Sequence, residues 1–297
     1  MSVSSTRFMA ASIGLLLALA LLFGAILGTG SAEAAKKKKK RDKKSPYVTA
    51  AVTVDSDGDG RVDGLLITYS EKVKVAKIKA GKGKVKKKNK NKKKQPWAAP
   101  GRTLGAIKVT GGGKQILVAL SPGPTADSAE VPQLSYRRVP KGAKGVVDRA
   151  GNQALTTAVR ATDGLAPQLL SARTADTNLN GRIDTLILTY SELVDAPQPA
   201  SYIVGGYAVT SATASGVTVT LGLAEGTTDT SAAPSVAAIA GADKDVAGNS
   251  QASDLTKTAA DGTPPAVIDA VTADTNANGR IDQIAVKFSE LIQHNLE

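Results

Sequence analysis

The chain has no cysteine, one histidine and one tryptophan among its 297 residues. The absence of cysteine excludes disulfides and a lipid-accepting cysteine, so apolar burial must hold the fold together, with the help of metal if the chain binds one. The histidine, His294, lies near the end of the chain and in no cluster. Three recurring serines therefore have no histidine nearby in the sequence to activate them. We expect a protein that is not an enzyme.

Residues 1–34 have the pattern of a secretory signal peptide. Arg7 precedes an apolar run from Met9 to Ile26, and Ala32-Glu33-Ala34 fits the A-x-A cleavage pattern. We expect cleavage near Ala35, and a secreted or cell-surface protein. An uncleaved membrane anchor is the alternative, because the apolar run approaches the length of a membrane span.

The basic charge is concentrated in two tracts. The net charge is +12, yet residues 36–44 carry +7 and residues 72–94 carry +13, so the rest of the chain carries a net −8. Charge runs of this kind are typical of disordered appendages that attract anionic polymers, such as cell-wall polymers. Specific nucleic-acid binding is not expected, because the second tract contains no arginine and no aromatic residue.

A nine-residue acidic loop occurs three times, at residues 55–63, 176–184 and 274–282. Oxygen-bearing side chains occupy its first, third, fifth and ninth positions, and glycine occupies the sixth. The seventh position is an arginine whose backbone carbonyl can add a ligand. The predicted calcium ligands are Asp55, Asp57, Asp59, Arg61 and Asp63; Asp176, Asn178, Asn180, Arg182 and Asp184; and Asp274, Asn276, Asn278, Arg280 and Asp282.

Calcium suits these loops because it takes roughly six to eight oxygen ligands and tolerates flexible geometry. The first loop carries four carboxylates, whereas each of the others carries two with two asparagines. They are not EF-hands, because position twelve is never a glutamate and no helices flank the loops. The alternative is a polar turn in which Asp and Asn side chains bond their own backbone.

A strand is predicted directly after each loop. Apolar residues alternate with period two, which indicates an antiparallel sheet with one buried face. The inward residues are Leu65, Ile67 and Tyr69; Leu186, Leu188 and Tyr190; and Ile284, Val286 and Phe288. Each strand closes on Ser-Glu, at Ser70-Glu71, Ser191-Glu192 and Ser289-Glu290. We interpret the recurring glutamates as structural rather than catalytic.

Two further motifs follow in fixed order. Asp-x-Ala-Gly-Asn occurs at residues 148–152 and 245–249, and Asp-Gly-x-x-Pro occurs at residues 163–167 and 261–265. We interpret the first motif as a turn, since Asp, Gly and Asn are turn formers. A second metal site or a glycan contact is the alternative there.

The combined order of these motifs resembles bacterial Ig-like domains of S-layer and other secreted surface proteins. The resemblance implies tandem β-sandwich modules that serve as spacers, adhesive stalks or accessory modules. We therefore expect an all-β chain of tandem Ig-like β-sandwiches. The expected parts are a basic disordered linker at 35–45, a first module at 46–164, a second at 165–262 and an incomplete third at 263–297.

The Lys-rich tract reads as a disordered insertion at about residues 72–96 of the first module, because low hydrophobicity and like-charge repulsion disfavour folding. The third repeat has the loop and one good strand but none of the later pieces. Even one strand pair cannot bury an apolar face, and we favour a truncated or incomplete sequence.

The expected function is that of an exported calcium-binding structural or adhesive protein, with glycans or surface proteins as partners. One alternative is a carbohydrate-binding or accessory module of a larger secreted enzyme. Another is a polyanion-binding surface protein that acts through its lysine tracts.

Overall fold

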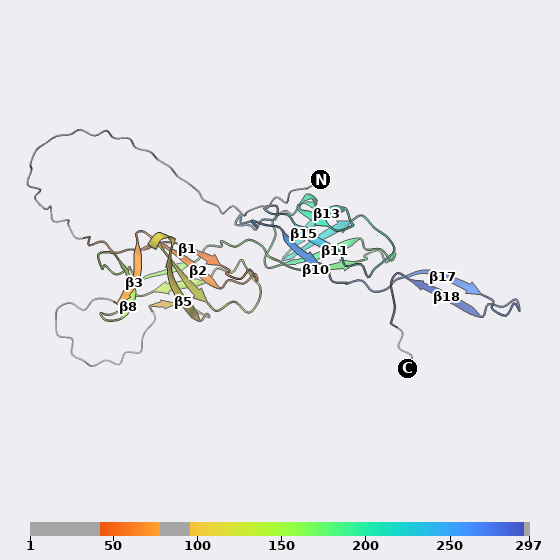
Figure 1. The fold of residues 1–297 in the computed structure, drawn as a ribbon, viewed down its shortest axis with the longest axis horizontal. Coiled ribbons are helices and arrows are strands. Elements are labelled where there is room, and N and C mark those ends of the chain that lie inside the picture. The colour runs from red at the N-terminus through yellow and green to blue at the C-terminus, as the bar shows by residue number, and fades with distance from the viewer. Residues whose placement is uncertain (1–41, 78–95, 294–297) are drawn as a thin grey trace, which may run out of the picture. The chain divides into compact units, whose positions relative to one another are not determined.

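The computed structural model describes residues 42–77 and 96–293 (Figure 1). All of them belong to one unit that begins at Arg41. Within this part the chain is all-β, with antiparallel sheets and two short 3-10 turns, as the sequence predicted. The expected signal peptide lies outside the described residues. No helix in the described part is long and apolar enough to span a membrane.

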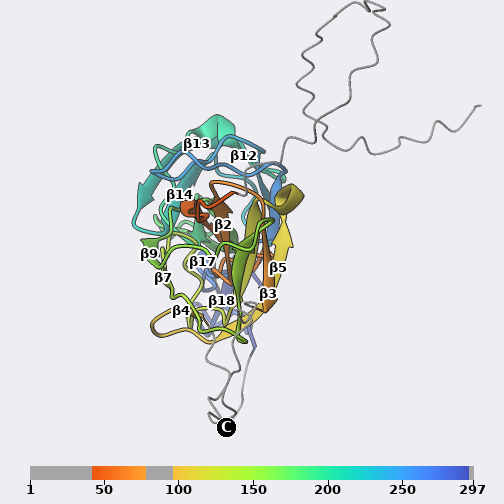
Figure 2. The same ribbon diagram turned by 90° about the vertical axis from the view of Figure 1, so that its left-hand side faces the viewer.

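The first repeat contains three antiparallel sheets. One has four strands in the order β1-β2-β6-β5, one pairs β3 with β8, and one has the order β4-β7-β9. Figure 2 shows β3 beside β5. The strands are β1 (Val48–Val54), β2 (Gly64–Tyr69), β3 (Val73–Lys77), β4 (Trp97–Ala98), β5 (Leu104–Thr110), β6 (Gln115–Leu120), β7 (Gln133–Tyr136), β8 (Lys144–Asp148) and β9 (Thr157–Arg160).

The core of the first repeat lies between these sheets. Leu65 and Ile67 on β2 are fully buried, as period-two alternation requires of the inward face. They belong to the same cluster as Leu134 and Tyr136 on β7 and Val146 on β8. Apolar side chains from separate sheets therefore form one core, which is the organisation of a β-sandwich.

The second repeat uses the same plan. A four-stranded sheet has the order β10-β11-β14-β13, and a three-stranded sheet has the order β12-β15-β16. Its core cluster runs from Leu169 to Ala259 and includes Leu186, Leu188 and Tyr190. The strands are β10 (Leu169–Ala175), β11 (Thr185–Tyr190), β12 (Tyr202–Val204), β13 (Val209–Ser215), β14 (Thr218–Leu223), β15 (Ser235–Ala238) and β16 (Leu255–Thr258).

The third repeat is a single hairpin within the described residues, formed by β17 (Val267–Ala273) and β18 (Gln283–Phe288). Its inward residues are much more exposed than their counterparts. Ile284 is 64% exposed, whereas Leu186 in the second repeat is fully buried. The hairpin thus has the alternating pattern of the other repeats, and no second sheet of the described residues covers its apolar face.

The first strand of each repeat carries a β-bulge at the same position. The register shifts between Val48 and Ala50 on β1, and the shift recurs at the matching places of β10 and β17. The residues left unpaired are Thr49, Leu170 and Ile268. A bulge redirects the side chain of its extra residue, so these three side chains leave the regular alternation.

The prediction of disorder from residue 72 onwards is wrong at its beginning. Val73–Lys77 form β3, which pairs with β8, and Val73 is 5% exposed. Valine and lysine alternate here, so one face of a short strand can be buried while the lysines stay in solvent. Trp97, at the far side of the tract, is also buried. Residues 78–95 lie outside the described part.

Candidate metal centres

The first predicted loop gathers three carboxylates. Oxygens of Asp55, Asp57 and Asp59 lie within 4.8 Å of one another. The pKa of Asp57 is raised, by desolvation first and then by contact with Asp55 and the negative charge of Asp59. Asp63 is turned elsewhere, because both of its oxygens accept hydrogen bonds from the Ser56 hydroxyl at 2.7–2.8 Å.

The loop carboxylates also bind their own backbone. Asp55 accepts the amides of Gly58 and Gly60 at 2.8 Å and 2.9 Å. Asp59 accepts the amide of Arg61 and lies 3.6 Å from its side-chain Nε. These contacts are those of a polar turn, and they leave the three clustered carboxylates facing one another.

The second loop repeats this backbone pattern. Asp176 accepts the Gly181 amide at 2.7 Å, and Asn180 accepts the Arg182 amide at 3.0 Å. Asp184 accepts the Thr177 hydroxyl at 2.6 Å. Partial burial opposes ionisation of Asp184, but the hydrogen bonds from Thr177 outweigh it and lower its pKa.

The third loop has the same connections. Asp274 accepts the Gly279 amide, Asn278 accepts the Arg280 amide, and Asp282 accepts the Thr275 hydroxyl at 2.8 Å. Asn278 also donates its amide to Asn276 at 3.1 Å. The three loops therefore share one hydrogen-bonding pattern and form the same structural unit.

Glu225 adds a carboxylate to the second loop that the sequence pattern did not predict. It follows β14 and accepts hydrogen bonds from the side-chain amides of Asn178 at 2.7 Å and Asn180 at 2.9 Å. Its sequence separation from the loop hid this contact, and only the pairing of β11 with β14 brings it near.

A second kind of acidic cluster, made of three side chains, lies at the boundary between the first and second repeats. Oxygens of Asp163, Glu192 and Asp245 lie within 4.8 Å of one another. Asp163 comes from the Asp-Gly-x-x-Pro segment, Glu192 from the Ser-Glu end of β11, and Asp245 from the Asp-x-Ala-Gly-Asn turn. We call these residues the boundary triad. Glu192 and Asp245 are 4% and 2% exposed.

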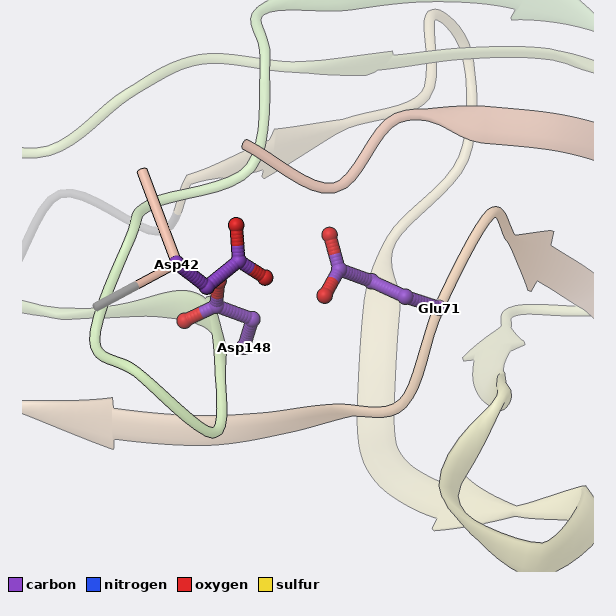
Figure 3. A group of neighbouring side chains, drawn as sticks. All are labelled: Asp42, Glu71 and Asp148. Atoms are coloured by element: carbon purple, nitrogen blue, oxygen red, sulfur yellow. The ribbon is translucent and has the colours of Figure 1, made fainter. Parts of the chain in front are cut away.

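The same three positions are brought together in the first repeat. Asp42, Glu71 and Asp148 point their carboxylates toward one another (Figure 3). Glu71 and Asp148 occupy the places of Glu192 and Asp245 in the sequence motifs, and Asp42 lies four residues before a proline, as Asp163 does. We call these three residues the N-terminal triad. This cluster is more open, because Asp42 is exposed and Glu71 is half-buried.

Burial and mutual repulsion disfavour the simultaneous ionisation of all three carboxyl groups of the boundary triad. Burial raises the pKa of Glu192 to about 7; the Ser128 hydrogen bond opposes this shift, while the nearby negative charges of Asp163, Asp245 and Asp127 reinforce it. Burial likewise raises the pKa of Asp163, and the charge of Asp245 adds to the rise. Neither ion pair of the described residues involves this triad.

Hydrogen bonds nevertheless tie the triad to the preceding repeat. The Ser128 hydroxyl lies 2.6 Å from Glu192 Oε1 and 2.5 Å from the Ser191 hydroxyl. The Gln168 amide donates to Ser191 at 2.9 Å. With Glu192 ionised, one orientation satisfies every donor: Gln168 donates to Ser191, Ser191 to Ser128, and Ser128 to the carboxylate.

From the sequence, Asp148 and Asp245 are interpreted as turn formers, with a second metal site or a glycan contact as the alternative. The glutamates Glu71 and Glu192 are interpreted as structural. Asp148 and Asp245 do form turns, since each accepts both the backbone and side-chain amides of the asparagine four residues later. The available signal was that all three acidic positions recur together, in the same order, in both complete repeats.

Several acidic clusters of the described residues could therefore hold a metal ion: the first loop and the two triads. All three offer carboxylate oxygens, the donors that hard cations such as calcium prefer. The two triads are built from residues distant in sequence, so an ion there would link separate segments.

The chain matches no protein-family model and no solved structure. Over 95 residues it is 36% identical to the outer cell wall protein of Brevibacillus brevis. The match covers 31% of this chain and 10% of that protein. The chain thus spans about a tenth of the length of this relative.

Proposed function

We propose that the chain is an exported, non-catalytic structural protein of the cell surface, built from Ig-like modules that calcium stiffens at their boundaries. The single observation that carries this proposal is the boundary triad of Asp163, Glu192 and Asp245. Three carboxylates share a buried space there, and no lysine or arginine of the described residues forms an ion pair with them.

Buried like charges are costly unless a proton or a cation compensates them. Glu192 belongs to the second repeat and is bonded to Ser128 of the first, while Asp163 comes from the segment that joins them. A calcium ion on these oxygens would therefore restrain the junction as well as neutralise it. The acidic loops would bind further ions in the weak range usual for extracellular modules.

The surface role is supported by the similarity to the outer cell wall protein and by the repetition of the fold. Tandem modules with the same boundary contacts suit a protein that bears load or spans distance. The lysine tracts would add attraction to anionic cell-wall polymers. Glycans or other surface proteins are the further partners of this proposal.

Two measurements test the proposal. Intact cells of the native host are treated with added protease, and the chain is followed with an antibody. The chain is expected to be digested, whereas its retention in the cytosolic fraction would contradict export. The purified chain is expected to melt at a higher temperature in calcium than in chelator. Glu192→Gln is expected to lose most of that gain, whereas the exposed Asp195→Asn keeps it.

A polyanion-binding function is favoured by one observation, the thirteen lysines at residues 72–94. Deletion of residues 78–95 removes most of them and leaves β3 in place. If this were the main function, the deletion would abolish retention on cell-wall polymers while unfolding and calcium dependence stayed unchanged.

A further inference from the structure

Exposed lysines from three segments of the first repeat come together along β3. Figure 1 shows β3 beside β8, and in this pairing Lys77 lies directly opposite Lys144. At the other end of β3, the stem of Lys72 lies beside Gly113, since a Cβ on that glycine would be 3.8 Å from the Lys72 Cγ. Lys114 is the next residue. We call the exposed set the lysine face: Lys72, Lys74, Lys77, Lys114 and Lys144.

The lysine face holds like charges close together without compensation. Lys77 and Lys144 are cross-strand partners, and like charges directly opposite each other destabilise a sheet. Neither ion pair of the described residues includes a lysine of this face. Glu71 and Asp148, the acidic residues nearest to β3 in the chain and in the pairing, turn their carboxylates to the N-terminal triad (Figure 3). An anion from outside the chain would therefore relieve the repulsion.

The second repeat has the same plan without these charges. An isolated bridge between Asp195 and Lys244 stands there in the place of the pairing between β3 and β8. The positions that correspond to the lysine face carry no basic residue and are Leu193, Asp195, Gln198, Val217 and Gly241. The fold therefore does not require lysine at these places.

The contrast extends to the whole repeats. Residues 42–77 and 96–164 contain fifteen Lys and Arg against ten Asp and Glu, whereas residues 165–262 contain four against ten. Two copies of one fold thus have opposite net charge. Because the acidic positions are equally numerous, the difference lies in the added basic residues, and a part of these forms the lysine face.

The composition of the lysine face indicates the kind of anion. All five residues are lysines, which bind phosphate as flexible point charges, whereas arginine suits carboxylates through two parallel hydrogen bonds. Neither β3 nor β8 contains an aromatic residue on which a nucleic-acid base could stack. Alternate residues of a strand, such as Lys72 and Lys74, are about 6.6 Å apart, so a linear chain can meet them in succession.

We propose that the lysine face binds a linear anionic polymer of the cell envelope that carries phosphate groups along its chain. The polymer lies along β3, from Lys114 and Lys72 at one end to Lys77 and Lys144 at the other. The inference rests on the attraction to anionic polymers in the proposed function, and it assigns a part of that attraction to a folded surface. It does not depend on calcium.

Two triple variants separate this surface from the overall charge of the chain. The face variant removes three charges of the lysine face: Lys74→Gln, Lys77→Gln and Lys144→Gln. The control variant removes three exposed charges elsewhere: Arg160→Gln, Lys257→Gln and Lys287→Gln. Both variants keep residues 78–95 and have the same net charge, so a difference between them reports position.

The test is titration of the full mature chain with labelled inorganic polyphosphate in calcium-free buffer, over a series of salt concentrations. Each lysine that contacts phosphate releases counterions, so the slope of log affinity against log salt changes by about 0.7–0.9 per contact. The face variant is expected to bind at least about 10-fold more weakly than the control variant, with a slope smaller by about 2. Polyphosphate is also expected to raise the melting temperature of the control variant more than that of the face variant.

Equal affinities and equal salt slopes for the two variants would overturn the lysine face as a site, while the attraction to anionic polymers would stand. A wild type that does not bind polyphosphate would overturn both. A face variant that is less stable than the wild type without polymer would contradict the repulsion between Lys77 and Lys144.

Two further probes test the chemistry of the partner. Polygalacturonate, a carboxylate polymer, is expected to bind more weakly than polyphosphate at equal charge; equal binding would overturn the assignment to phosphate. Single-stranded DNA is expected to distinguish the two variants less than polyphosphate does, because the face offers no stacking. If DNA bound more tightly than polyphosphate and lost as much affinity in the face variant, the partner would be a nucleic acid.

Discussion

The Ser128 hydroxyl lies 2.6 Å from a carboxylate oxygen of Glu192, although the two residues belong to different repeats. Ser128 is fully buried and Glu192 is 4% exposed. This bond makes the acidic boundary part of the packing between repeats. The ionisation of Glu192 and the docking of the repeats are therefore physically coupled.

Ser128→Ala should destabilise the second repeat and loosen its junction. It removes the hydrogen bond to Glu192 and the partner of Ser191, and an unpaired buried group costs about 1–3 kcal/mol. Urea unfolding is the measurement. Ser135→Ala, which loses only an exposed bond to a backbone carbonyl, is the control. Equal stability of the two variants would show that the boundary bond contributes nothing.

Stability in chelator should fall as pH rises from about 4.5 to about 7. The folded state holds a proton on Glu192 up to a pKa of about 7, whereas the unfolded chain releases it near the ordinary glutamate pKa of 4.5. Between these two pH values the folded state holds a proton on Glu192 that the unfolded chain has lost, so raising the pH favours unfolding. The raised pKa of Asp163 acts in the same direction.

The check is a series of thermal melts in chelator, with Glu192→Gln as the comparison. The variant cannot titrate at this position, so its melting temperature should vary less over the same window. Calcium competes with the proton, and the gain in melting temperature from calcium should increase with pH. If the melting temperatures of the wild type and the variant changed with pH in parallel, the result would count against a raised pKa of Glu192 in the folded state.

Asp57→Ala combined with Asp59→Ala should lower the melting temperature in calcium and hardly change it in chelator. Without metal the two carboxylates repel each other and Asp55, so their removal costs little. With metal, two ligands are lost. The control is Asp254→Asn on the second repeat. Equal losses in calcium and chelator would contradict a metal role for the first loop.

Asp243→Asn should destabilise the second repeat without changing calcium binding. The Asp243 carboxylate accepts the hydroxyls of Tyr190 at 2.7 Å and Tyr202 at 2.9 Å, and all three side chains are buried. The amide can accept at one oxygen only, so one hydroxyl loses its acceptor, at a cost of about 1–3 kcal/mol. Urea unfolding and calcium titration together check this; a loss of calcium binding would show that the effect reaches the triad.

Much of the fold could be predicted because the strand after each loop alternates strictly. Leu65, Ile67 and Tyr69 face inward, and the same places are buried in the second repeat. The third repeat has the same alternation of apolar residues, but these residues are not buried. The alternation predicts which face of a strand is apolar, but it does not predict what covers that face. β3 was missed because its lysines dominate the local composition, although Val73 and Val75 alternate with them.

The candidate site was only partly predictable. The loops are contiguous in sequence, so their recurring oxygen-bearing positions could be recognised directly. The triads are assembled from a linker, a strand end and a turn, and only the tertiary fold places Asp163 beside Glu192 and Asp245. The contact of Glu225 with the second loop likewise depends on strand pairing that no local pattern reports.

The most direct test of calcium at the boundary is isothermal titration of the full mature chain and its Glu192→Gln variant. Our account predicts that the variant binds one calcium fewer than the wild type, while Asp195→Asn binds the same number. Identical stoichiometry and affinity for wild type and Glu192→Gln would contradict a calcium site at Asp163, Glu192 and Asp245.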